Sequence, residues 1–152
     1  MSVLKDKRLP SKAEYVNTAN EIYIETMAFL PRLSARYSRL MAGFPAKLAA
    51  EVVEYTEKAN KIFPSDEQRK QLRKAHLLQA QSSLSALDVA LLHCYLVMVK
   101  NPQGCFTDSK GKTVSEEKAI ERLDAMSQSL GELIAKEEEW YGLACWQCLH
   151  LV

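Results

Sequence analysis

The stretch Leu77–Met98, LLQAQSSLSALDVALLHCYLVM, decides the fold class of this chain. Its apolar residues recur at alternating steps of three and four, a spacing that places them on one face of an α-helix. This face consists of Leu77, Ala80, Leu84, Leu87, Leu91, Cys94 and Met98. A capping box at Ser65–Gln68 precedes the stretch and Asn101-Pro102 follows it, so we predict one helix over residues 65–100.

Two helices are predicted before this one. The capping box Ser11–Glu14 and the break at Pro31 bound a helix over residues 11–30. Residues 34–62 also show helical apolar spacing, with a glycine and Pro45 inside the pattern. Because proline lacks a backbone N–H, we expect a kink near Pro45, or a helix that starts no earlier than that residue.

A last helix is predicted over residues 114–150, after a polar loop and a cap at Thr113–Glu116. No segment keeps a period of two, so a sheet is not expected. Short connections between long helices favour antiparallel neighbours. We therefore predict an all-α fold, an antiparallel up-down-up-down four-helix bundle in which residues 1–152 form a single domain; the alternative is an extended coiled coil.

The composition is that of an ordinary globular chain, with 47% hydrophobic and 26% charged residues. Residues 1–8 lack the apolar core of a signal peptide. No uninterrupted apolar run approaches the roughly 20 residues of a membrane span. We therefore expect a cytoplasmic protein with no membrane role, and we interpret the four cysteines as reduced thiols.

The usual chemical sites are not supported by the sequence. No histidine follows a glutamate by three positions, as a di-iron bundle would require. Gly111-Lys112-Thr113 lacks the first glycine and the preceding strand of a phosphate-binding loop. Cys145, Cys148 and His150 could supply part of a zinc site, but no second pair exists. We expect no enzyme, no catalytic residue, no metal and no cofactor.

Charge is distributed unevenly along a chain whose net charge is +1. Residues 116–152 contain eight acids and three bases, a net charge of −5, so residues 1–115 carry +6. Lys and Arg bind nucleic-acid phosphates without reading sequence. We predict such binding at a first basic cluster, Arg32, Arg36 and Arg39, and at a second basic cluster, Arg69, Lys70, Arg73 and Lys74.

The second basic cluster has an alternative interpretation. Counting back along the apolar face from Leu77 leads to Arg73 and Lys70, where core residues are due. The helix would then extend beyond its neighbours, and these charges would meet water or the acids Glu137–Glu139.

Two segments resemble a known family. Leu30-Pro31-Arg32 ends the first amphipathic helix, and Lys74–Leu78 leads into Gln79–Val89. Over roughly residues 15–100 this arrangement is similar to the four-helix-bundle proteins of the ribosomal-RNA intervening-sequence class. Within that class the chain most resembles the accessory variability determinant (Avd) proteins of diversity-generating retroelements.

The resemblance implies a function as well as a fold. It implies a homopentameric barrel of four-helix bundles that binds a reverse transcriptase together with its template RNA or DNA. It implies no catalytic residues. The binding surface in this family is basic, and the positions that could correspond here are those of the two basic clusters.

The C-terminus independently indicates a partner. Eight of its last ten residues are apolar, whereas a chain end is normally polar. Such an end should be buried, either in its own bundle or across a subunit interface. We favour the interface, and predict a partner or oligomer interface at Trp140, Leu143, Trp146, Leu149 and Leu151. Two hypotheses remain: a non-enzymatic accessory subunit of a reverse transcriptase, or an oligomeric protein–protein interaction scaffold with no nucleic-acid role.

Overall fold

The computed structural model describes the backbone of residues 13–150 and the side chains of residues 13–144, and within these residues the fold is all-helical with no strand. The all-α prediction is therefore confirmed. The helices are α1 (Glu14–Phe29), the short 3-10 helix η1 (Leu30–Arg32), α2 (Ala35–Met41), α3 (Gly43–Asn60), α4 (Glu67–Lys100) and α5 (Glu116–His150).

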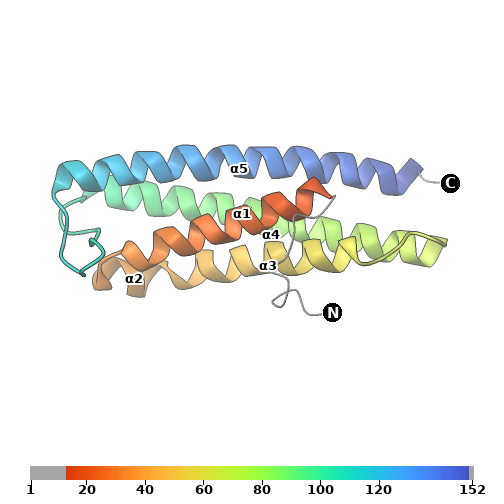
Figure 1. Cartoon of the computed structure of the whole chain (residues 1–152), viewed down its shortest axis with the longest axis horizontal. Coiled ribbons are helices and arrows are strands. Elements are labelled where there is room, and N and C mark those ends of the chain that lie inside the picture. The colour runs from red at the N-terminus through yellow and green to blue at the C-terminus, as the bar shows by residue number, and fades with distance from the viewer. Residues whose placement is uncertain (1–12, 151–152) are drawn as a thin grey trace.

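The longer helices lie side by side along the long axis of the molecule (Figure 1). α1 packs against α3 and α5, and α4 packs against the same two helices from the other side. The core between them includes the predicted face of α4, because every residue from Leu77 to Met98 on that face is buried. The alternation of three and four was thus sufficient to identify the buried side of this helix.

The predicted helix over residues 34–62 is two helices, α2 and α3, separated at Ala42. Pro45 explains the break, because its ring clashes with the carbonyl of Met41, four residues earlier, where α2 ends. Pro45 itself is tolerated in the first turn of α3, where its missing N–H would have had no partner. The expectation of a start no earlier than Pro45 was wrong, since α3 begins at Gly43.

Helix starts also differ from the predicted capping boxes. The cap of α4 is Asp66, whose carboxylate accepts a hydrogen bond from the Arg69 backbone N–H at 2.8 Å, so the helix begins later than predicted. Ala13 occupies the cap position of α1 and supplies no side-chain bond. The predicted cap Ser11 lies outside the described residues. For α5, the Ser115 hydroxyl accepts from the Lys118 N–H at 3.4 Å.

The connection between α4 and α5 is not simply a polar loop. Cys105 and Phe106 are buried, and the Phe106 ring meets Phe29 of α1 edge-on at 5.5 Å. The Thr107 N–H donates to the Arg32 carbonyl at 2.7 Å. This connection therefore holds η1 in place, and with it the start of the first basic cluster.

α4 is unusually apolar for its length. An 18-residue window within it has a mean hydropathy of 1.6, enough by length and composition to cross a membrane, and 39% of this window is buried in the fold. It is the one helix of the described residues to meet those criteria. The sequence interpretation considered only uninterrupted runs, so it missed this property. A core helix can meet the same criteria, and the question is what covers the remaining apolar surface.

Candidate functional site

A second apolar stripe runs along the outside of α4. Val89, Leu92, Leu96 and Val99 are separated by steps of three and four, and each is exposed. Continued backwards, the stripe passes through two serines to the exposed Leu78. We call these five apolar residues the outer seam of α4. The sequence contained this signal, because the outer seam repeats the steps of three and four and three of its residues, Leu78, Leu92 and Val99, directly follow buried positions, but only the buried face was interpreted.

An apolar groove adjoins the outer seam between α2, α3 and α4. Leu40 and Phe44 stand on one side with 78% and 59% of their surfaces exposed, and Val89 and Val97 of α4 stand on the other. The groove has a volume of about 480 Å³. Large contiguous apolar surfaces on proteins usually mark interaction sites. The outer seam and this groove together make such a surface.

One residue of the first basic cluster, Arg39, lies next to the groove, whereas Arg32 lines a separate pocket with Glu25 and Asp108. Arg32, Arg36 and Arg39 are all exposed, and Arg39 directly precedes Leu40. The Arg36 guanidinium lies over the Tyr37 ring, 4.8 Å from its centroid. No ion pair involves any of the three among the described residues. This cluster is therefore available to phosphates.

The second basic cluster does not form one open surface. Arg69 forms an ion pair with Asp66 within the first turn of α4. Arg73 is partly buried, and its Nη2 donates to the Tyr15 hydroxyl of α1 at 3.3 Å. Lys70 and Lys74 are half-buried. The interpretation that this end of α4 overhangs into water fails for Arg73, which packs between helices.

Part of the predicted C-terminal interface can be placed. Leu143 is 52% exposed, and Trp140 is half-buried. The side chains of Trp146, Leu149 and Leu151 lie outside the described residues. Trp140 and Leu143 line a pocket of about 310 Å³ together with Arg73. The structure thus brings one predicted nucleic-acid residue and two predicted interface residues to the same place.

A buried acid lies deeper at the same end of the fold. Glu137 of α5 is fully buried, and neither carboxylate oxygen has a hydrogen-bond partner among the described residues. Burial raises the pKa of the Glu137 carboxyl from 4.5 to about 9, and the nearby Tyr141 and Lys136 oppose this rise less strongly. The alternative in which the second basic cluster meets Glu137–Glu139 gains no support at Glu137, which forms no ion pair among the described residues, although Glu138 and Glu139 are exposed.

Tyr141 lies near Glu137 on α5 and forms a hydrogen bond with the neighbouring helix α3. Its hydroxyl shares a hydrogen bond of 2.6 Å with the Thr56 hydroxyl of α3, and both residues are fully buried. Burial raises the pKa of Tyr141, so the phenol stays neutral. The polar groups of Thr56, Glu137 and Tyr141 therefore form an uncharged layer inside the apolar core.

Nothing in the described residues makes a metal centre or a nucleophile. No group of three His, Cys, Asp or Glu side chains could hold a metal ion in that part of the chain. Burial raises the pKa of the Cys94 and Cys105 thiols, which makes both poor nucleophiles. The side chains of Cys145, Cys148 and His150 lie outside the described residues.

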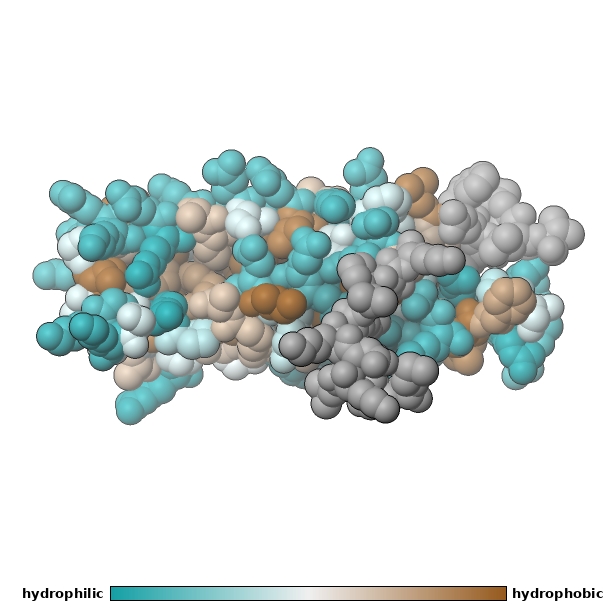
Figure 2. Space-filling view, in the orientation of Figure 1, coloured by the Kyte–Doolittle hydropathy of each residue, from teal (hydrophilic) through white to brown (hydrophobic). Residues whose placement is uncertain are grey.

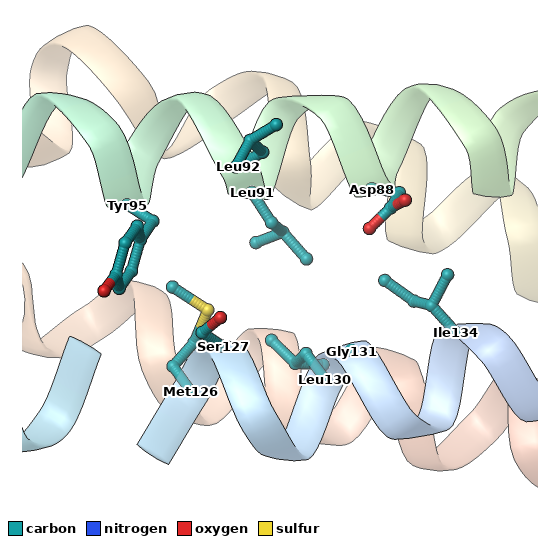
Figure 3. A pocket seen from close by; sticks show the side chains of 9 residues that line it. All are labelled: Asp88, Leu91, Leu92, Tyr95, Met126, Ser127, Leu130, Gly131 and Ile134. Atoms are coloured by element: carbon teal, nitrogen blue, oxygen red, sulfur yellow. The ribbon is translucent and has the colours of Figure 1, made fainter. Parts of the chain in front are cut away.

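A crevice between α4 and α5 is also a poor ligand site (Figure 3). Its volume is about 140 Å³, and apolar side chains such as Leu91 and Ile134 make up most of its lining. Asp88 is the one charged side chain in it. Nearby, the Tyr95 hydroxyl already donates to Asp124 at 3.0 Å. The crevice lacks convergent polar groups, so the surface of α4 and the first basic cluster are the stronger candidates.

Acidic residues gather on α5, which packs against both α1 and α4. Figure 2 shows hydrophilic side chains along the edge formed by α5.

No family model, curated protein or solved structure matches the chain. The functional interpretation therefore depends on the surfaces described above.

Proposed function

We propose that this chain is a non-enzymatic subunit that assembles through the outer seam of α4 and binds nucleic acid through the first basic cluster. In this proposal the fold is an antiparallel up-down-up-down four-helix bundle, and the assembly is a homopentamer. Its protein partner is a retroelement reverse transcriptase, as the resemblance to the Avd class implies, and it acts in the cytoplasm.

The observation that carries the proposal is the exposed outer seam. Burying a Leu or Val side chain contributes about 1.5–3 kcal/mol, so completing the burial of five half-exposed ones would contribute about 1 kcal/mol each. The adjoining groove, with Leu40 and Phe44, adds to this. Association costs rotational and translational freedom. The free energy gained by burying a surface of this size offsets a substantial part of that cost.

Charge supports an assembly with distinct faces. The first basic cluster lies on η1 and α2, whereas the acids of residues 116–139 lie on α5. A ring of subunits would repeat the cluster around a common axis and multiply a modest patch into a strong one. The near-neutral charge of one subunit is therefore compatible with binding to phosphates.

The test of assembly is a mass measurement by light scattering coupled to size exclusion. We expect five times the subunit mass of 17.2 kDa for the parent chain. Replacing Leu92 and Leu96 by Glu should yield the monomer with unchanged helix content, because both residues are exposed in one subunit. Ile24→Glu on α1, also exposed, is the matched control. A parent chain that is monomeric at micromolar concentration contradicts the proposal.

The scaffold with no nucleic-acid role is the second candidate. The internal contacts of Arg69 and Arg73 favour it, because they remove two cations from the basic surface. It predicts that replacing the first basic cluster changes no binding to RNA or DNA. A reverse transcriptase gene adjacent in the genome, and co-purification of its product with this chain, would favour the accessory-subunit proposal.

A further inference from the structure

The pocket beside the start of α1 collects side chains from all the longer helices. Tyr15 comes from α1, Asn60 from α3, Arg73 from α4 and Trp140 from α5. Leu143 and Ala144 supply an apolar wall. A volume of about 310 Å³ is at the small end of the range for ligand sites in proteins.

The polar groups of this pocket form a chain in which donors exceed acceptors. Arg73 Nη2 donates to the Tyr15 hydroxyl at 3.3 Å, and that hydroxyl donates to Asn60 Oδ1 at 3.3 Å. The Tyr15 oxygen and the Asn60 carbonyl oxygen are thus already used. The Arg73 Nε–H and the Trp140 Nε1–H are buried without an acceptor among the described residues, so a ligand would approach the outer part of the guanidinium.

The charge of Arg73 is also uncompensated. No carboxylate of residues 13–144 forms an ion pair with it. Glu14 lies on the rim but is exposed, where water screens its charge. A partly buried cation without a counter-ion is costly, and an anion bound beside it offsets this cost.

We propose that this pocket binds a small organic oxyanion. Its carboxylate or phosphate oxygens pair with the Arg73 guanidinium, and its apolar part lies against Leu143 and Ala144. Guanidinium groups suit such oxyanions because their N–H groups form a planar fork. The inference does not depend on assembly or on nucleic-acid binding.

The test is a titration followed by the Trp140 indole N–H signal in ¹⁵N NMR spectra of the full chain. The chain contains two tryptophans, so Trp140→Phe identifies the signal. The probes are benzoate, phenyl phosphate and the neutral benzyl alcohol. We expect a saturable shift with benzoate, phenyl phosphate or both, and none with benzyl alcohol. Comparing the affinities of the two anions shows whether the pocket prefers a carboxylate or a phosphate.

Variants separate a bound anion from a general effect of salt. Arg73→Gln should weaken the anion affinity at least tenfold, and Arg73→Lys should restore it only in part, because a lysine ammonium lacks the planar fork of the guanidinium. Arg69→Gln is the matched control, since it removes a nearby cation that is paired with Asp66 outside the pocket. It should leave the affinity unchanged.

Three results would overturn the proposal. One is a shift that stays linear with anion concentration, and another is an equal response in Arg73→Gln. The third is binding that appears only after residues 1–10 are deleted, because the chain itself would then fill the pocket in the full-length protein.

Discussion

Replacing the buried Glu137 by Gln should stabilise the fold at neutral and alkaline pH and flatten its pH dependence. Glu137 sits on the buried face of α5 with no hydrogen-bond partner for either oxygen among the described residues. It is therefore protonated in the folded state and ionised in the unfolded state. Gln has nearly the same shape and cannot ionise, so the substitution removes this difference.

The magnitude follows from the pKa of Glu137, which burial raises from 4.5 to about 9. Because the folded-state pKa is the higher one, unfolding releases a proton between these values. The stability linked to this group is complete below pH 4.5 and is lost as the pH rises toward 9. The slope is about 1.4 kcal/mol per pH unit, which amounts to about 4 kcal/mol near pH 7.5.

Urea unfolding followed by far-UV circular dichroism measures this effect, with parent and variant compared at several pH values between about 5 and 8. The gap between Glu137→Gln and the parent should widen with pH. Glu138→Gln is the control, because Glu138 is adjacent but exposed, and its gap should stay constant. Parallel profiles for the parent and Glu137→Gln would refute the reasoning.

Three further outcomes are expected. Leu84→Ala should lower the free energy of unfolding by about 2–5 kcal/mol in urea titrations, because Leu84 is fully buried; a change below about 1 kcal/mol would contradict its place in the core. Asp66→Ala should cost about 1 kcal/mol in the same assay, because it removes the cap of α4, and an unchanged midpoint would show that the cap is dispensable. Replacing Arg32, Arg36 and Arg39 by Gln should reduce the salt dependence of RNA or DNA binding, by about 0.9 in log–log slope per lost duplex contact, in fluorescence anisotropy. The control is a triple replacement of three exposed lysines with the same loss of charge, at Lys58, Lys110 and Lys136. This control should change the salt dependence of binding less.

The helical framework could be predicted because the signals are local. Steps of three and four identified the buried face of α4, and prolines marked the helix ends. The break at Ala42 was placed too late, because the effect of Pro45 acts on the carbonyl four residues earlier. The buried Phe106 was missed, because a short loop sequence does not reveal which helix it packs against.

The candidate site was less predictable, since it depends on which helices become neighbours. The position of Glu137 on the apolar face of α5 was visible, between Ile134 and Tyr141, but its burial depends on the neighbouring helices, such as α3, whose Thr56 bonds Tyr141. Arg73 was correctly noticed as a charge at a core position. Only the structure shows that it meets Tyr15 and a pocket.

The two apolar sides of α4 have a consequence for synthesis in the cell. α4 emerges from the ribosome before α5, so its buried face has no cover from that helix until the last part of the chain is made. Its outer seam stays about half-exposed even when all the described residues are folded. Nascent and orphan subunits with such surfaces are targets for chaperones and prone to aggregation. If the chain assembles as proposed, yield should therefore depend on how soon each new subunit meets its partners.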